Sequence, residues 1–246
     1  MLFRSTLLDI GTVEAINRFP VKSFAGESLP SVELKWSGLD GDRQYAFYKA
    51  GDGSRFPWLT GRAVSPINTY GACFSEPDNP RKSTVRITAA GQDYDLRDET
   101  LRQRLSDAVG EEVRLIQIGR GIFDTMPISV MATATPKLVE EAAGVPIDPR
   151  RFRANLVIRT PDGAAARETH WVGGTLVFGV GPSPAKLLVS APIDRCVMIT
   201  IDPDTGERNP AILRTVVEKF DNFIASRCSP AALGRISIGD RVRLER

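Results

Sequence analysis

Short segments that alternate apolar with polar or small residues recur along the chain, and this spacing restricts the fold more than any other feature. The first hundred residues contain four of them: Val13–Ile16, Val32–Trp36, Thr84–Thr88 and Tyr94–Leu96. Residues 236–238 and 241–244 repeat the pattern at the end of the chain. A period of two is typical of half-buried β-strands, and glycine- and aspartate-rich turns lie between the segments. The pattern predicts a mainly β protein of the α+β class, rich in barrel-like sheets with a few short helices.

Capping residues mark the expected helix boundaries. Asp98 is placed to cap a helix that ends at Gly110. Three pairs put a capping side chain directly before proline: Thr135-Pro136, Asp148-Pro149 and Asn209-Pro210. We expect the first pair to begin a helix that stops at Gly144, and the third to begin a helix whose apolar stripe reaches Phe220.

The composition argues against several classes of protein. The 246 residues include 32 basic and 30 acidic side chains, a net charge of +2, which does not favour a nucleic-acid surface. No stretch of apolar residues is long enough to predict a membrane-spanning helix, and the first five residues do not resemble a signal peptide. The three cysteines Cys73, Cys196 and Cys228 form no CxxC pair. This cysteine usage predicts a reducing compartment, and hence a cytoplasmic protein.

One cysteine carries the strongest chemical signal. Cys196 follows Arg195 and precedes an Asp-Pro-Asp-Thr-Gly turn at residues 202–206. A neighbouring guanidinium favours the thiolate, which is the form that ligates metals and attacks electrophiles. A soft thiolate also suits transition metals. The alternative is that Cys196 is a small buried hydrophobic residue, and its position in the sequence does not decide between the two.

Cationic and hydroxyl side chains lie beside several expected bends of the backbone. Lys22 and Ser23 follow a proline closely, and Arg43 follows a glycine-rich turn. Charge-assisted donors held near a bend are what a phosphate group needs. For each of these residues, a solvated surface position is the alternative.

Two further segments have side chains suited to an anion. Arg151 and Arg153 precede a strand pattern together with Asn155, and arginines two residues apart point the same way in an extended segment. They would form a forked anion clamp, although a surface ion-pair network is equally compatible. Thr133 and Thr135 lie at an expected helix start, where free N–H groups favour an anion. A purely capping role for Thr135 is the alternative.

Other signatures of chemistry are absent from the sequence. His170 is the single histidine and cannot form a site of several histidines, so we expect it at the surface or behind a site. The sequence contains no phosphate-binding GxxxxGK[ST] loop, dinucleotide GxGxxG motif, GxSxG motif or zinc spacing. No ferredoxin-like cysteine run follows Cys228, so an iron–sulfur cluster is not expected.

Four segments resemble, in order, those of a known family: residues 19–23, 38–43, 151–158 and 191–206. The first two are similar to the MOSC N-terminal β-barrel domain. The last two are similar to the Arg-Phe-Arg-x-Asn and cysteine segments of MOSC domains, which form the C-terminal domains of molybdenum cofactor sulfurases and the core of the amidoxime-reducing mARC proteins. The resemblance implies an N-terminal β-barrel-like domain at residues 8–120 and a MOSC-type β-barrel at residues 121–246.

The resemblance also implies a ligand and an activity. Cys196 would be the protein ligand to the metal of the molybdenum cofactor. The residues that match cofactor contacts of the family are Lys22, Ser23, Arg43, Thr133, Thr135, Arg151, Arg153, Asn155 and Arg195. The activity implied is the reduction of small N-hydroxylated compounds, with electrons from a ferredoxin-, cytochrome b5- or flavoprotein-like partner and with no nucleic-acid or membrane partner. Pyridoxal phosphate binding is implied only by the general description of the family. Ala132 and Thr133 stand where some members have Ser and Glu.

An alternative from a different class is a sulfur carrier or cofactor-delivery module, in which Cys196 holds a persulfide and no substrate is turned over. Either function would use side chains from both halves of the chain, since Lys22 and Arg43 come from the first half and Arg153 and Cys196 from the second. We therefore expect the pocket between the two halves. A fragment that begins near residue 120 is expected to keep Cys196 but to bind the cofactor far more weakly.

Overall fold

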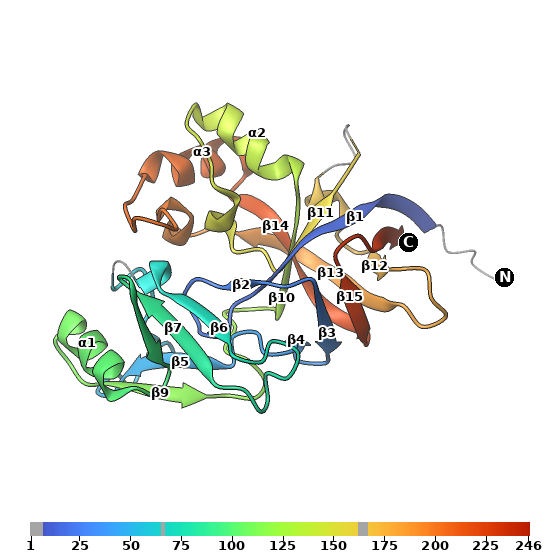
Figure 1. The fold of residues 1–246 in the computed structure, drawn as a ribbon. Coiled ribbons are helices and arrows are strands. Elements are labelled where there is room, and N and C mark those ends of the chain that lie inside the picture. Colours follow the sequence, from blue (N-terminus) through green and yellow to red (C-terminus); the bar gives the residue numbers. More distant parts are fainter. Residues whose placement is uncertain (1–6, 65–66, 162–166) are drawn as a thin grey trace.

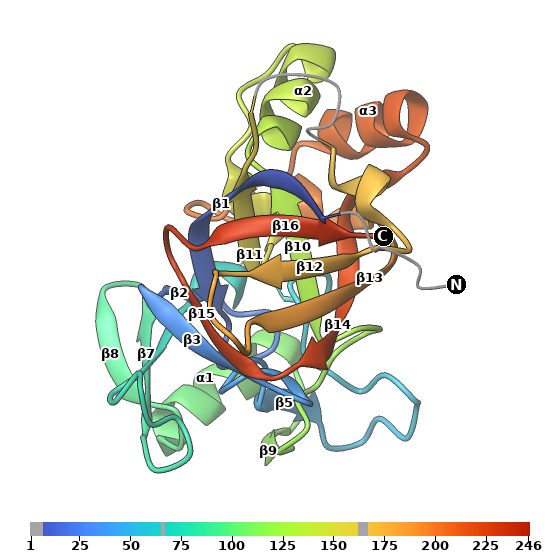
Figure 2. The same ribbon diagram turned by 90° about the vertical axis from the view of Figure 1, so that its right-hand side faces the viewer.

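A closed β-barrel forms the larger part of the molecule (Figures 1 and 2). The computed structural model describes residues 7–64, 67–161 and 167–246. Within these ranges the barrel strands, in pairing order, are β11 (Leu156–Arg159), β10 (Ile128–Ala132), β14 (Phe223–Ala232), β13 (Ala185–Asp194), β12 (Thr175–Phe178), β16 (Arg241–Glu245) and β1 (Leu7–Arg18). β1 pairs with both β16 and β11, which closes the sheet on itself. The predicted mainly β, barrel-rich fold with few short helices is confirmed.

Barrel strands pair antiparallel with one exception. β10 and β11 run parallel, with Val130 opposite Leu156. Parallel neighbours need a long crossover. The chain supplies it through α2 (Ala134–Ala143) and the 3-10 helix η2 (Pro149–Phe152).

The barrel interior follows from the alternation seen in the sequence. In β16, Val242 and Leu244 point into the core with 0% and 2% of their surface exposed, while the arginines on either side face outward. Ile10, Val13 and Ile16 of β1 are buried in the same core. Burying these side chains is the main force that holds the barrel closed.

The first half of the chain builds a second, smaller layer around its own core. Its elements are β5 (Tyr45–Lys49) paired with β9 (Val113–Gln117), the meander β6 (Gly71–Phe74), β7 (Val85–Ala89) and β8 (Gln92–Asp95), the 3-10 helix η1 (Ile67–Thr69), and α1 (Glu99–Val109). The predicted caps of α1 are confirmed. The Asp98 side chain accepts a hydrogen bond from Thr100 N at 2.7 Å, and Gly110 ends the helix in the left-handed conformation.

Strand pairing joins the two halves of the chain. β2 (Glu27–Ser28) pairs with the end of β1. β3 (Ser31–Lys35) pairs with β4 (Gly38–Leu39) on one side and with β15 (Gly234–Ser237) on the other. The strand that closes the barrel, β1, also belongs to the first half, because it precedes the predicted boundary near residue 120.

Helices cover one end of the barrel. α2 and α3 (Pro210–Phe220) pack together at the end away from α1 (Figure 1), beside the 3-10 helices η4 (Glu168–Trp171) and η5 (Val197–Thr200). The Asn209 cap of α3 is confirmed, since its side chain accepts from Ala211 N at 3.1 Å. The Thr135 cap is wrong, because α2 already begins at Ala134 and the Thr135 hydroxyl donates to Glu168 instead. No helix in the described ranges is long and apolar enough to cross a membrane.

Candidate functional site

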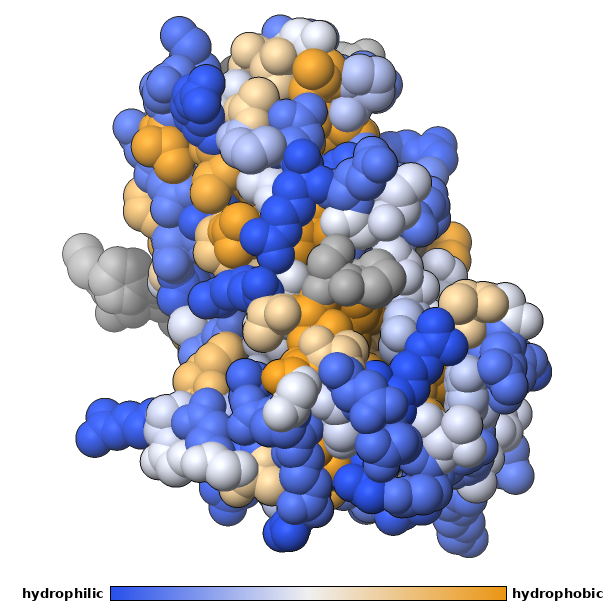
Figure 3. Space-filling view, turned by 90° about the vertical axis from the view of Figure 1, so that its left-hand side faces the viewer, coloured by the Kyte–Doolittle hydropathy of each residue, from blue (hydrophilic) through white to orange (hydrophobic). Residues whose placement is uncertain are grey.

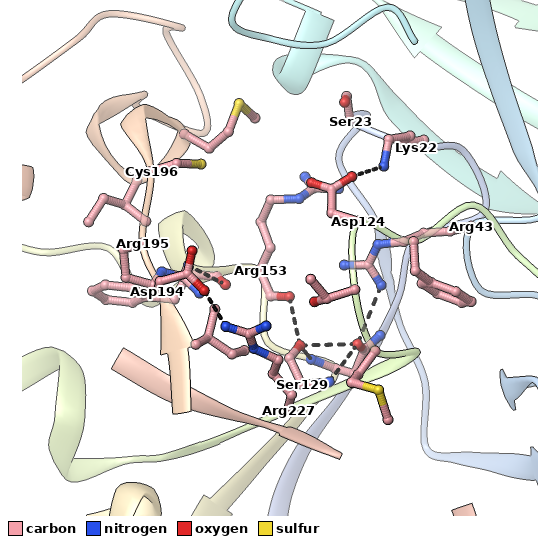
Figure 4. A pocket seen from close by; sticks show the side chains of 18 of the residues that line it. Lys22, Ser23, Arg43, Asp124, Ser129, Arg153, Asp194, Arg195, Cys196 and Arg227 are labelled. Carbon is pink, nitrogen blue, oxygen red and sulfur yellow. Dashed lines mark hydrogen bonds and ion pairs between the residues drawn. The ribbon is translucent and has the colours of Figure 1, made fainter. Parts of the chain in front are cut away.

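A cavity of about 350 Å³ lies where the first half of the chain meets the barrel (Figure 4). Cationic side chains from both halves line it: Lys22, Arg43, Arg62, Arg153, Arg195 and Arg227. Two carboxylates, Asp124 and Asp194, face them. Figure 3 shows a face of the molecule on which hydrophilic side chains predominate and apolar side chains are exposed between them in several places. Because positive charge outnumbers negative charge in a partly enclosed space, the cavity favours an anionic ligand.

Lys22 is held in place by the backbone around it. Its N–H donates to Tyr45 O at 2.8 Å, which anchors the bend after Pro20 to β5. The side chain is 7% exposed, and its ammonium donates to Ile122 O at 3.2 Å and pairs with Asp124. Burial lowers the pKa of Lys22, and the Asp124 carboxylate opposes this effect. Ser23 follows directly and also lines the cavity.

The Phe19 ring contacts two of the cationic groups. The guanidinium carbon of Arg43 lies 4.7 Å from the Phe19 ring centroid, and that of Arg153 lies 4.3 Å from it. Stacking on an aromatic ring stabilises a guanidinium through the quadrupole of the ring. Phe19 is 6% exposed, so the ring itself is fixed. We refer to Lys22, Arg43 and Arg153 together as the cationic wall.

Arg153 is the least compensated member of the cationic wall. Its guanidinium makes no hydrogen bond to any other residue of the described ranges. Burial, together with the charges of Arg43 and Arg195, lowers the pKa of Arg153 to about 9. The group therefore keeps its charge at neutral pH without a hydrogen-bond partner among the described residues.

Asn155 organises the floor of the cavity. Its side chain is 1% exposed, and its carbonyl oxygen accepts from Arg43 at 3.3 Å and from Ser129 N at 3.2 Å. Its amide nitrogen donates to Asn17 O at 3.1 Å. One side chain thus links β1, β10 and a guanidinium of the cationic wall.

The thiol lies on another side of the cavity. Cys196 follows β13, precedes η5 and is exposed. The guanidinium beside it comes from the first half of the chain, with Arg62 Nη2 at 3.6 Å from Cys196 Sγ. Arg208 Nη2 holds the Arg62 loop by donating to Gly61 O and Arg62 O, both at 3.1 Å. A Cβ at Gly61 would lie 3.0 Å from Asn68 Oδ1 and 3.2 Å from Met198 Cε, so a side chain there would require these neighbours to shift.

Arg195, the sequence neighbour of Cys196, makes its hydrogen bond elsewhere. Its Nη2 donates to Phe152 O at 2.8 Å, and its guanidinium carbon lies 5.5 Å from the Phe152 ring centroid. Burial lowers the pKa of Arg195 to about 10, while the nearby Cys196 acts in the opposite direction. Arg195 lines the cavity and remains charged at neutral pH.

Comparison with known proteins places the chain in a family. The model of the MOSC domain matches residues 119–243, and the model of the MOSC N-terminal beta barrel domain matches residues 10–109. The chain belongs to the MOSC family.

Solved structures of other MOSC-like chains are distant in sequence. YuaD from Bacillus subtilis is 15% identical, with 98% of each chain covered and a TM-score of 0.52, which shows a shared fold. YiiM from Geobacillus stearothermophilus is 18% identical over 48% of this chain and 54% of that chain, with a TM-score of 0.36. None of the curated proteins matches the chain.

The forked pair predicted for this MOSC domain is wrong. Arg151 belongs to η2 and Arg153 is left-handed, so the two side chains do not share one face of an extended segment. Arg151 turns away from the cavity, donating to Thr200 O at 3.0 Å and to Asp202 Oδ2 at 2.7 Å. Arg151 thereby supports the turn at residues 202–206 that follows Cys196. Within this turn, Asp202 also accepts a hydrogen bond from Thr205 N at 3.0 Å.

The threonines predicted at the helix start also lie away from the cavity lining. Thr133 precedes α2 without a side-chain capping bond. Thr135 is 2% exposed and donates to the buried Glu168 at 2.6 Å, a residue that the sequence did not single out. His170 is exposed, as expected. Lys22, Ser23, Arg43, Arg153, Asn155, Arg195 and Cys196 do line the cavity.

Some MOSC proteins bind the molybdenum cofactor, and the residues of this cavity fit such a ligand. The cofactor carries a phosphate, for which the cationic wall, with its Arg153 guanidinium facing no carboxylate partner in an ion pair within the described ranges, is suitable. It also needs a soft protein donor, and the exposed Cys196 thiol lines the same cavity. Cys228 is unsuited to that role, because it is fully buried in the barrel core and burial raises its pKa.

Proposed function

We propose that this MOSC protein binds the molybdenum cofactor between its two halves and reduces small N-hydroxylated compounds. The observation that carries the proposal is the combination, in one cavity, of the cationic wall and the exposed Cys196 thiol. Neither half of the chain provides both, since Lys22 and Arg43 precede β10 and Cys196 follows β13. A ligand with an anionic end and an affinity for thiolate has complementary partners on both sides.

The proposal assigns a role to the polar residues of the cavity that would contact the cofactor or hold such a contact in place. The cationic wall and the Ser23 hydroxyl would hold the phosphate through charge-assisted hydrogen bonds. Asn155 would fix the Arg43 guanidinium, to which it is 3.3 Å away. Cys196 would supply the thiolate ligand, and Arg62 would place a positive charge beside it.

The bound cofactor would supply the two-electron redox chemistry and oxygen-atom transfer. Reduction of an N-hydroxylated compound cleaves its N–O bond and takes up two electrons and two protons, which leaves an N–H group and water. The electrons would come from a separate redox protein, because the three cysteines are too far apart in sequence for a ferredoxin-like cluster motif. The Arg62 and Arg195 guanidiniums would favour neutral or anionic substrates next to Cys196.

The decisive experiment is the metal content of Cys196→Ser. Protein from a host that makes the cofactor should contain molybdenum, and the variant should lose it together with N-reduction by an artificial electron donor. The hydroxyl is nearly the same size as the thiol but is far less acidic and less soft. Cys73→Ser is the matched control, since Cys73 is a free cysteine of β6 outside the cavity.

Two results would contradict the proposal. If Cys196→Ser had the metal content and the rate of the wild type, the thiol would not be the metal ligand. A persulfide on Cys196 in wild-type protein that contains no molybdenum would favour the sulfur-carrier alternative, for which the exposure of the thiol is the supporting observation.

A further inference from the structure

The cationic wall already has a carboxylate against it. Asp124 lies on the segment between β9 and β10, and its side chain forms an ion pair with the ammonium of Lys22 (Figure 4). The same carboxylate acts electrostatically on Arg153. A single residue of the connecting segment therefore neutralises part of the wall from inside the cavity.

The two partners of this ion pair differ in their contact with water. The Lys22 side chain is 7% exposed, whereas the Asp124 side chain is 53% exposed. A buried ammonium without a counter-ion is costly, so Lys22 needs a negative partner. A half-exposed carboxylate gains little from such a pair and returns to water at small cost. The geometry therefore allows another anion to replace Asp124 as the counter-ion of the buried Lys22 ammonium.

The other carboxylate of the cavity is differently placed. Asp194 pairs with Arg227, and Arg227 also donates to Pro192 O at 3.1 Å. Neither residue contacts Lys22 or Arg153 through a hydrogen bond or an ion pair in the described part of the chain. Asp194 therefore compensates a separate cation at the edge of the cavity.

We propose that Asp124 is an internal counter-ion that occupies the anion subsite of the cationic wall until the phosphate of a ligand displaces it. The inference rests on the proposed function for the location of that subsite. Because the carboxylate and the phosphate compete for the same ammonium, Asp124 lowers the affinity for every anion by a constant factor. It also links occupancy of the subsite to the position of the segment that joins the two halves.

Titration calorimetry with inorganic pyrophosphate on the full chain tests the competition. Asp124→Asn should bind pyrophosphate about two- to fivefold more tightly than wild type, which corresponds to the strength of a partly exposed ion pair. Asp194→Asn removes the same charge from the same cavity and should change the affinity less than twofold. In a Lys22→Gln background, Asp124→Asn should give no comparable gain, because the contested ammonium is gone.

The outcomes separate the two proposals. Pyrophosphate binding that is equal or weaker in Asp124→Asn overturns the counter-ion role while the subsite stands. Equal gains in Asp124→Asn and Asp194→Asn also overturn it, since they would reflect the overall charge alone. Absence of pyrophosphate binding to both wild type and Asp124→Asn, with circular dichroism showing folded protein, overturns the anion subsite and the proposed cofactor site with it.

Discussion

Three residues of the cavity adopt a left-handed backbone conformation that non-glycine residues rarely take. Ser23 has φ 70°, Arg43 has φ 49° and Arg153 has φ 52°. Such conformations cost free energy and persist only where neighbouring bonds enforce them. Arg43 N donates to Phe19 O at 2.6 Å, and Arg153 N donates to Arg150 O at 3.0 Å. The backbone thus presents the cationic wall in advance of any ligand, which reduces the ordering that binding requires.

The charge of Arg153 predicts how anion binding changes with pH. Its pKa is lowered to about 9, so the cationic form is complete at pH 7 and is lost as the pH rises through 9. Burial lowers the pKa of Lys22 as well, which acts in the same direction. Sulfate stays a dianion in this range, so its affinity should be constant from pH 7 to 8 and fall between pH 8.5 and 10. Calorimetric titrations at these pH values measure it.

Arg153→Gln is the control for this prediction. It should bind sulfate about tenfold more weakly at pH 7, the loss expected for a charge-assisted contact. It should also lose less affinity between pH 8.5 and 10 than wild type. A sulfate affinity of the wild type that is the same at pH 7 and pH 10 would show that Arg153 does not titrate as its burial indicates.

Residue types close to a bend were predictable, whereas their partners were not. Lys22, Arg43, Arg153 and Cys196 were singled out from the sequence and do line one cavity. Arg62 was missed because it meets Cys196 across 134 residues, and Asp124 meets Lys22 across 102. Local sequence contains no trace of such a contact, since only the docking of the two halves creates it.

At the scale of elements, a buried carboxylate bonds to residues at the start of α2. Glu168 of η4 is 1% exposed and accepts from Ala132 N at 3.1 Å, Thr135 Oγ1 at 2.6 Å and Ala225 N at 2.7 Å. It thereby ties η4 to β10, α2 and β14. The sequence offered Thr135 as a cap, but a tertiary partner from 33 residues away takes its hydroxyl. Caps whose side chains face solvent, such as Asp98, were predicted correctly because no tertiary partner in the described part of the chain competes for them.

Glu168→Gln should destabilise the fold strongly. An amide keeps the shape of the carboxylate but turns an NH2 group toward at least one of three donors, which leaves a buried N–H or O–H unpaired. We expect the free energy of unfolding to fall by about 2–4 kcal/mol, measured by urea denaturation. Thr135→Val removes one donor and keeps the carboxylate, so it should cost only about 1 kcal/mol. A smaller loss in Glu168→Gln than in Thr135→Val would show that Glu168 does not hold these elements together.

At the scale of the whole molecule, the two halves are connected through the sheets as well as through the site. β1 closes the barrel between β11 and β16, and β3 pairs with β15. The barrel class followed from strand spacing, but β11 and β16, the barrel strands that pair with β1, lie 140 or more residues away and leave no periodic signal. A fragment starting near residue 120 therefore lacks a barrel strand. The sequence alone predicted that such a fragment binds the cofactor more weakly, and the structure leads us to expect that it also loses its fold.

Residues 119–246 alone should fail to form a cooperative fold. Without β1, the edges of β11 and β16 stay unpaired and the core loses Ile10, Val13 and Ile16. Unpaired edges promote aggregation. Leu7 of β1 lies opposite Glu245 of β16, so a short glycine-serine turn after Arg246 can lead into residues 7–18 as a hairpin. That permuted fragment should recover soluble monomer and a cooperative urea transition, whereas a version with residues 7–18 scrambled should not. A cooperative transition of the plain fragment, with unchanged β-sheet circular dichroism, would show that β1 is not needed to close the barrel.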